Sequence, residues 1–249
     1  MSLPSTNILS VKVCTLSAER IKLYTKSSVA ERRRLNIFTP NSQMLLAARK
    51  DAKLSALLNS SSLNIPDGTG VRLAAKIQKK PPLAQISGID LAEYLLAIAA
   101  KRGWRVFLLG GKRGVAKLAQ KNIKRRFPKL DICGIHHGYF EKHGTENAEV
   151  IAKINSARPD LLFVCFGFPM QEKWLRDNAG SLSGVSLAMG LGGAIDVWSG
   201  RIARAPHALQ KAGLEWLWRT LLEPKRAKIF LDIPKFLFAV LKEARANTQ

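Results

Sequence analysis

Acidic residues are scarce in this sequence. Its 249 residues contain 18 Asp and Glu against 40 Lys and Arg, which gives a formal net charge of +22. A field of that sign attracts polyanions, so nucleic acid, an anionic membrane and phosphorylated substrates all stay open as partners. The sequence has no nucleic-acid motif and no strand in which basic and aromatic residues interleave, and both absences argue against a nucleic-acid partner.

Cysteine and long apolar runs are also scarce. The three Cys residues are an odd number, and Cys133 and Cys165 lie in apolar, strand-like runs. This favours buried thiols in a reducing compartment over a disulfide framework. No Cys/His cluster has the spacing of a zinc site. No run of about 18 apolar residues exists to span a bilayer. The N-terminal segment has no long apolar stretch behind a basic start, so we expect no signal peptide.

Short apolar runs alternate with segments of helical periodicity from residue 36 onward. The apolar runs include 104–111, 160–167 and 185–193, and the helical segments include 42–59, 90–103 and 115–128. Continuous apolar strands between helices indicate a parallel sheet that is covered on both faces. The sequence therefore predicts an α/β fold with a mostly parallel, Rossmann-like sheet, helices on both faces and a helical appendage at the C-terminus.

Several of the apolar runs end in glycine. The positions concerned are Gly110, Gly111, Gly167 and Gly192. Ligands of open α/β sheets bind outside the carboxyl ends of the strands, where glycine lets the backbone approach a phosphate and helix N-termini offer N–H groups. We therefore expect these glycines to contact a ligand. The alternative is a set of strand-to-helix turns that bind nothing, since neither G-x-G-x-x-G nor a P-loop is present.

Longer motifs give a more specific signal. They are "TPN" (39–41), "PDGTGVRLA" (66–74), "GFPMQEKW" (167–174), "GLGGAIDVWSGRIARAP" (190–206) and "GLEWLWRTLLEPKR" (213–226). In this order they resemble the WecG/TagA/CpsF glycosyltransferases, glycosyltransferase family 26, over roughly residues 36 to 230. The resemblance implies transfer of an N-acetylhexosamine-type sugar, such as N-acetylmannosamine or its uronic acid, from UDP to a polyprenyl-diphosphate-linked sugar. Such enzymes act at the cytoplasmic membrane face while bacterial surface polysaccharide is built.

The resemblance assigns roles to several polar residues. Asp67 matches the general base of an inverting transfer, although Asp before Gly is also ordinary turn chemistry. Thr39 and Asn41 are expected to bind the sugar, and one of them also suits a helix cap near Ser42. Gln171 is expected in the nucleotide-sugar pocket, where an amide offers both a donor and an acceptor.

Two further residues and three arginines complete the predicted site. Tyr139 suits stacking on a base or sugar, or a place in the core. Asp196 suits binding of the donor, or ordering of the glycine loop. The chain has no D-x-D pair for Mg²⁺ or Mn²⁺, so we expect no metal and no cofactor. Helix N-termini and arginines are then expected to stabilise the negative charge of the leaving UDP. The arginines that match basic positions of the family are Arg204, Arg219 and Arg226.

The sequence also departs from the family pattern at three positions. Gln85 stands where the family often has arginine, Met170 where lysine is frequent, and Ile229 where a C-terminal arginine is common. These changes concern how the diphosphate and the acceptor are held. They leave Asp67 and Gln171 in place.

The domains predicted are a UDP-sugar-binding catalytic domain, 1–202, and a basic amphipathic appendage, 203–249. The appendage is expected to face an anionic membrane surface and to complete the active site, with a helix starting near Pro234. The enzyme is then cytoplasmic and peripheral on the inner face of the membrane. The alternative for the appendage is a helix packed on the domain's own core or on another subunit, and the sequence leaves a homo-oligomer open.

Two other classes of function match single features of the sequence. The high positive charge suggests a non-enzymatic protein that binds nucleotides or nucleic acid. A parallel sheet also suits a nicotinamide-dependent oxidoreductase, but the dinucleotide glycine pattern is missing.

Overall fold

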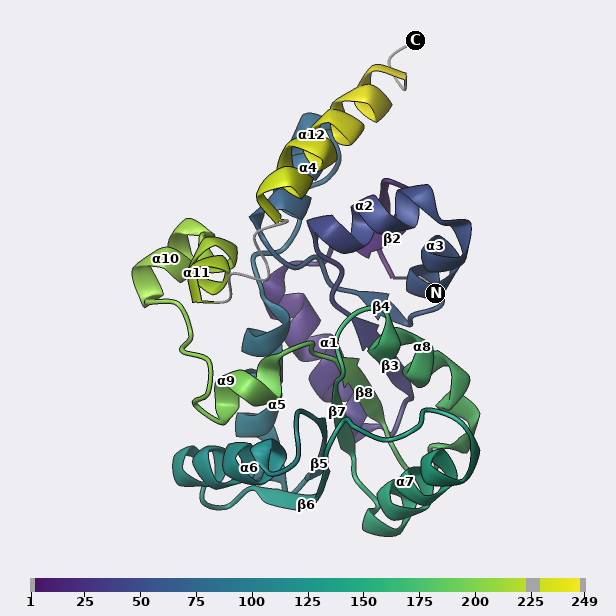
Figure 1. Ribbon diagram of the computed structural model, residues 1–249, viewed down its shortest axis with the longest axis vertical. Helices are drawn as coiled ribbons and strands as arrows, with labels where there is room; N and C mark the ends of the chain where they lie inside the picture. Colours follow the sequence, from purple (N-terminus) through teal and green to yellow (C-terminus); the bar gives the residue numbers. More distant parts are fainter. Residues whose placement is uncertain (1–2, 223–228, 247–249) are drawn as a thin grey trace. The chain divides into compact units, whose positions relative to one another are not determined.

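The computed structural model describes residues 3–222 and 229–246 (Figure 1). Its contacts divide the chain into two compact units. Unit 1 consists of Met1–Arg20, Thr39–Ser87 and Arg204–Gln249, and unit 2 of Ile21–Phe38 and Gly88–Ala203. The predicted boundary between residues 202 and 203 stays a prediction as a division between functional domains.

Unit 2 contains a parallel sheet. Its strands, in hydrogen-bonded order, are β3 (Leu35–Phe38), β8 (Leu187–Gly190), β7 (Leu161–Cys165), β5 (Arg105–Gly110) and β6 (Asp131–His136). Each neighbouring pair of these strands runs parallel. The central strands β7 and β8 are buried along their whole length, because helices cover both faces and leave no position for a solvated side chain. The predicted α/β fold with a parallel, Rossmann-like sheet is confirmed.

The helices of unit 2 are distributed over both faces of this sheet. They are α5 (Gly88–Arg102), α6 (Val115–Arg126), α7 (Gly144–Ala157), α8 (Met170–Asp177) and α9 (Ala194–Trp198), together with most of α1 (Ala18–Ala30) and the short 3₁₀ helix η1 (Ala179–Ser181). In Figure 1, α5, α6 and α9 lie on one side of the sheet, and α7 and α8 lie on the other. This is the arrangement that right-handed crossovers impose when the chain moves first to one edge and then back.

Unit 1 is built from an antiparallel hairpin and a set of helices. The elements are β1 (Ser5–Ile8), β2 (Val11–Cys14), α2 (Ser42–Lys50), α3 (Ala52–Asn59), β4 (Leu63–Asn64), α4 (Thr69–Ile77), α10 (His207–Ala212), α11 (Glu215–Leu222) and α12 (Ile229–Ala246). Asn64 connects the hairpin to α3, because its Nδ2 donates to the backbone oxygens of Lys12 (2.9 Å) and Leu58 (2.8 Å).

One helix expected from the sequence is interrupted. Residues 42–59 form two helices that meet at Asp51, which has an extended backbone (φ −135°, ψ 108°). The Asp51 side chain accepts hydrogen bonds from the backbone N–H groups of Lys53 (2.8 Å) and Leu54 (3.4 Å) and so caps the second helix. The single helix predicted there was wrong, because a capping aspartate competes with continuation of the helix.

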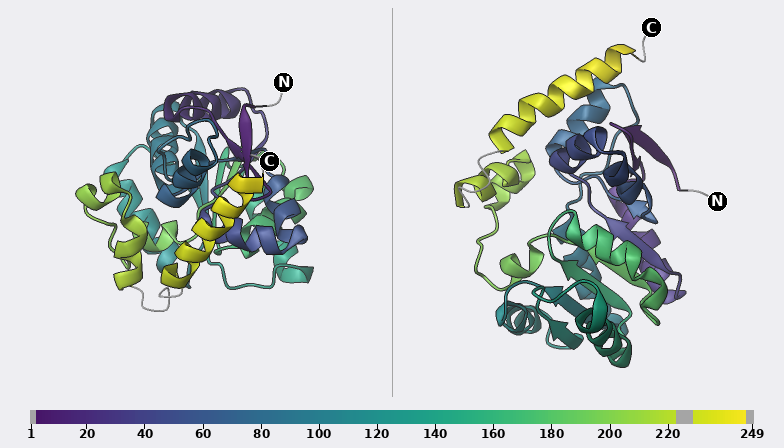
Figure 2. Two further views of the ribbon diagram at one scale, coloured as in Figure 1. Left: turned by 90° about the horizontal axis from the view of Figure 1, so that it is seen from above. Right: turned by 45° about the vertical axis from the view of Figure 1, so that its right-hand side comes forward.

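The C-terminal helix α12 packs on α2 and α4 within unit 1 (Figures 1 and 2). Phe236, Ala239 and Val240 are buried in this contact, and Gln43 donates to Asp232 across it at 2.9 Å. Pro234 lies inside the helix, so the predicted start near this residue was wrong. Among the described residues, no helix combines the length and apolar character needed to cross a membrane.

Candidate active site

Gln171 joins two of the loops that follow the strands of unit 2. Its Oε1 accepts from the backbone N–H of Gly167, after β7, at 3.3 Å, and from that of Gly192, after β8, at 2.8 Å. The side chain is 3% exposed, and a Cβ on Gly190 would come within 2.9 Å of its Nε2. The amide therefore fixes the edge of the sheet where the sequence predicts a ligand. Its predicted contact with the nucleotide sugar stays a prediction.

Glu172 sets the direction of the Gln171 amide. Its Oε1 accepts from Gln171 Nε2 at 2.8 Å, which leaves Gln171 Oε1 facing the two glycine N–H groups. Glu172 is fully buried, and its Oε2 has no hydrogen-bond partner among the described residues. Burial raises the pKa of this carboxyl to about 7, against a smaller lowering by the hydrogen bond from Gln171. This role was not predictable from the sequence, in which Glu172 is only an acid in the first turn of α8.

The remaining predicted glycines lie at the end of β5. Gly110 is its last residue. Gly111 donates to the backbone oxygen of Cys165 at 3.4 Å and accepts from the backbone N–H of Gly138 at 2.8 Å. These bonds connect the ends of β5 and β7 with the loop after β6. The four predicted glycines thus meet at one edge of the sheet, as the parallel topology requires.

Tyr139 lies in the loop after β6 and is 62% exposed, so its predicted place in the core does not apply. Lys142 orders this loop: its Nζ donates to the backbone oxygens of Gly138 (2.7 Å) and Phe140 (2.5 Å). The same ammonium group lies 3.7 Å from the centroid of the Phe140 ring and 4.6 Å from that of Phe166, a cation–π geometry. Desolvation lowers the pKa of Lys142. The loop therefore presents the Tyr139 ring on an ordered base.

Asp196 lies in the first turn of α9 and is half-buried. Its backbone oxygen accepts from Ser199 Oγ (2.8 Å) and from the backbone N–H of Arg201 (3.1 Å). The backbone at this position therefore orders the end of α9. Contact of its carboxylate with the donor stays a prediction.

Within unit 1 the structure brings Asp67 to the segment that holds Thr39 and Asn41. The backbone N–H of Asp67 donates to the backbone oxygen of Pro40 at 3.0 Å. Asn41 Oδ1 accepts from the N–H groups of Gln43 (3.0 Å) and Met44 (3.1 Å), so this residue caps α2 as the sequence allowed. Thr39 is 9% exposed. Asp67 is half-buried and lies beside the first turn of α4. The positive end of the helix dipole stabilises a carboxylate at this position.

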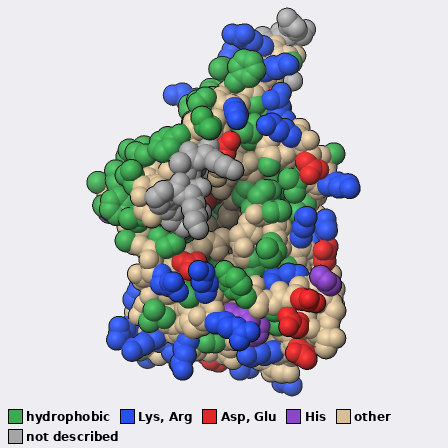
Figure 3. Space-filling model, in the orientation of Figure 1, with side chains coloured by type: hydrophobic (Ala, Val, Ile, Leu, Met, Phe, Trp, Pro, Cys, Tyr) green, Lys and Arg blue, Asp and Glu red, His purple; other side chains and the backbone are tan. Residues whose placement is uncertain are grey.

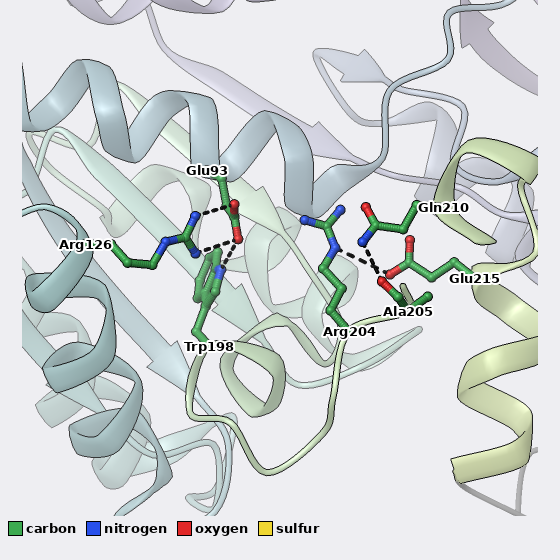
Figure 4. A network of polar contacts seen from close by, with 7 residues as sticks. All are labelled: Glu93, Arg126, Trp198, Arg204, Ala205, Gln210 and Glu215. Carbon is green, nitrogen blue, oxygen red and sulfur yellow. Dashed lines mark hydrogen bonds and ion pairs between the residues drawn. The ribbon is translucent and has the colours of Figure 1, made fainter. Parts of the chain in front are cut away.

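The structure describes the side chain of only one of the three predicted arginines. Arg204 Nε lies 3.8 Å from Glu215 Oε1, and beside it Gln210 Nε2 donates to the Ala205 oxygen at 2.6 Å (Figure 4). Arg219 lies on α11, but its side chain is outside the described part of the structure. Arg226 lies outside the described residues altogether. Their predicted contact with the diphosphate stays a prediction.

Within the described ranges, 3–222 and 229–246, no group of three or more His, Cys, Asp or Glu side chains lies close enough to hold a metal ion.

Comparison with known proteins finds relatives that share one name. The chain is 36% identical over 209 residues to the N-acetylglucosaminyldiphosphoundecaprenol N-acetyl-β-D-mannosaminyltransferase of Bacillus subtilis (strain 168), which covers 84% of this chain and 80% of the relative. It is 34% identical over 211 residues to the protein of the same name from Staphylococcus aureus (strain NCTC 8325 / PS 47), covering 85% of this chain and 81% of the relative.

The family model for the glycosyl transferase WecG/TagA/CpsF family matches residues 6–249. This match spans nearly the whole chain, including the segments that hold Asp67, Gln171 and Asp196 and the C-terminal helices. The chain therefore belongs to the WecG/TagA/CpsF family of glycosyltransferases.

Proposed function

We propose that this glycosyltransferase moves an N-acetylhexosamine, either N-acetylmannosamine or its uronic acid, from UDP to a sugar on a polyprenyl diphosphate, with inversion at the anomeric carbon. The relatives are named as transferases of N-acetyl-β-D-mannosamine to N-acetylglucosaminyldiphosphoundecaprenol. The observation that carries the proposal for this chain is the bond between Asp67 and Pro40. It holds the predicted base next to Thr39 and Asn41, the residues proposed to bind the sugar.

Asp67 is the proposed general base. Its carboxylate accepts the proton of the acceptor hydroxyl while that oxygen forms a bond to the anomeric carbon of the donor. The bond between this carbon and the β-phosphate oxygen breaks on the opposite face, and UDP leaves with the electron pair. Help of this kind contributes about 10²- to 10⁴-fold in rate.

The leaving diphosphate is proposed to be neutralised without a metal. The sequence has no D-x-D pair, and Arg204, Arg219 and Arg226 together with helix N-termini offer positive charge instead. In unit 2 the proposed donor contacts are Tyr139 and the glycine loops that Gln171 holds.

The enzyme is proposed to work as a peripheral protein on the inner face of the cytoplasmic membrane, because a prenyl-linked acceptor cannot leave the bilayer. The helix α12 supports this. One face packs on α2 and α4, while Leu231 (65%), Phe238 (70%) and Leu241 (45%) are exposed. Apolar side chains on an exposed helical face are typical of a helix that lies in a membrane interface.

The test is a transfer assay with the purified full chain, UDP-N-acetylmannosamine or its uronic acid, and a short-chain prenyl-diphosphate N-acetylglucosamine. A product whose mass equals that of the acceptor plus one donor sugar residue (the free sugar minus one water) is expected. Thermal stabilisation is measured in parallel with UDP, NAD and a DNA duplex, since a ligand that binds the native state raises its melting temperature. Lack of product with every UDP-sugar tried, together with stabilisation by NAD or DNA but not by UDP, would contradict the proposal.

A further inference from the structure

The helix α6 presents one basic face to solvent. Lys117, Lys121, Lys124 and Arg125 are all exposed, and at 100° per residue they fall within an arc of about 100°. The opposite face is buried against unit 2, and it is formed by Val115, Ala116, Ala119 and Ile123. The apolar half of this amphipathic helix is therefore already used by the fold, and the basic half, which we call the α6 face, is left to another partner.

The sequence around the α6 face contains no acid that neutralises it. Between Glu93 and Asp131 there are eleven Lys and Arg and no Asp or Glu. The two flanking acids are engaged elsewhere. Glu93 receives a bidentate contact from Arg126, at 3.1 and 2.7 Å (Figure 4), and Asp131 pairs with Arg105 at 3.1 Å. Among the described residues, none of the four cations of the α6 face forms an ion pair.

Further positive charge lies beside this face. Lys112 and Arg113 precede the helix, Lys129 follows it, and all three are exposed. Figure 3 shows Lys and Arg side chains gathered over the part of the surface where Figure 1 places α6. Leu118, at the edge of the α6 face, is 42% exposed. Positive charges gathered in this way repel one another and destabilise the folded protein unless an anionic partner neutralises them.

We propose that the α6 face binds the anionic headgroups of a lipid bilayer, as a second membrane contact carried by unit 2. The helix has no aromatic side chain on which a base would stack, which favours a bilayer over a nucleic acid. A bare cluster of Lys and Arg on an amphipathic helix is typical of binding to acidic lipid. The inference rests on the proposed membrane-bound acceptor, which brings the enzyme to such a surface.

The α6 face differs in kind from the exposed side of α12. Its contact is electrostatic, because its apolar residues are buried within the protein and only Leu118 is available to enter the interface. Charge attraction to a surface falls off within a Debye length, about 8 Å at physiological ionic strength. The contribution of α6 should therefore disappear at high salt, whereas burial of Phe238 and Leu231 of α12 in the interface should persist.

The experiment is flotation of the full chain with phosphatidylcholine vesicles, with and without phosphatidylglycerol. Each basic residue near an acidic surface contributes about 1 kcal/mol, or roughly fivefold in affinity. The variant K117Q/K121Q/K124Q/R125Q should therefore bind acidic vesicles at least about tenfold more weakly than the wild type and lose most of the salt dependence. The matched control K50Q/K53Q/K101Q/K153Q removes four exposed charges outside the α6 face and should stay near the wild type.

Flotation needs no sugar transfer, so its result is independent of the proposed function. Transfer to a short-chain acceptor in detergent should be unchanged in the α6 variant, which also shows that it folds. Equal flotation of the α6 variant and the wild type, or equal losses in the α6 and control variants, would overturn the proposal. So would tighter binding of the wild type to a DNA duplex than to acidic vesicles at matched phosphate concentration, since the face would then serve a nucleic acid.

Discussion

Replacing Glu172 by Gln should remove a pH-dependent cost to the stability of the folded protein. The carboxyl is fully buried, and its pKa is raised to about 7 from an ordinary value of 4.5, mainly because burial disfavours the charged form. Below about pH 4.5 the group is protonated in both the folded and the unfolded states and contributes nothing. Between about pH 4.5 and 7 the unfolded chain loses the proton while the folded protein keeps it, so stability falls as pH rises.

The magnitude follows from the two pKa values. One pKa unit corresponds to about 1.4 kcal/mol, so the free energy of unfolding should lose about 3 kcal/mol from this group by pH 8. The Glu172→Gln side chain carries no charge at any pH. It keeps an oxygen for Gln171 Nε2 but places an amide nitrogen where Oε2 has no partner, which adds a constant cost of about 1 to 3 kcal/mol. The free energy of unfolding of the wild type minus that of the variant should therefore fall by about 3 kcal/mol as pH rises, from a positive value to zero or below.

The assay is urea unfolding at a series of pH values, followed by tryptophan fluorescence, since Trp174 on the same helix is 2% exposed. Subtracting the variant from the wild type cancels the other titrating groups. Glu149→Gln, at an exposed position of α7, controls for loss of a carboxylate at the surface. Parallel profiles for the wild type and Glu172→Gln would refute the reasoning, because the folded state would then hold this carboxylate at no cost.

Three further predictions concern the reaction and its surroundings. Asp67→Asn should leave UDP binding nearly intact and lower turnover about 100-fold or more; a turnover within a few-fold of the wild type would reduce Asp67 to a turn residue. The initial rate should be the same in EDTA as in added Mg²⁺ or Mn²⁺, and full loss in EDTA with recovery on adding metal would contradict a metal-free mechanism. Asn41→Ala should lower the free energy of unfolding by about 1 kcal/mol through loss of the α2 cap; an unchanged urea midpoint would show that the cap contributes nothing.

Sequence patterns predicted the parallel sheet because its strands are continuous apolar runs bounded by glycine, and burial on both faces permits little else. The hairpin of residues 5–14 gave no such signal. Its turn residues Leu9 and Ser10 adopt positive φ values of 47° and 71°, where glycine or asparagine usually mark a turn. The break at Asp51 was missed because an aspartate suits both a helix surface and a cap, and only the backbone decides between them.

The candidate site was predictable in part for a similar reason. Residues at strand ends and turns follow from topology and motif order, so Asp67 and the glycines could be named. The engagement of the Gln171 amide could not, because it depends on the distance between two loops that are 25 residues apart in sequence at Gly167 and Gly192. Arrangement in space, rather than residue type, distinguishes a side chain that contacts a ligand from one that holds the loops.

The double acceptor role of Gln171 has a mechanical consequence. Gln171 Oε1 accepts a hydrogen bond from the loop after β7 and another from the loop after β8. Neither loop can move away without breaking its bond to this atom, and the position of the same atom also determines the bond to the other loop. A ligand that displaced one loop would change the free energy of displacing its neighbour, and the two should respond as a pair rather than one at a time. Hydrogen exchange at the N–H groups of Gly167 and Gly192 would then slow together when a nucleotide binds, because a single opening event exposes both.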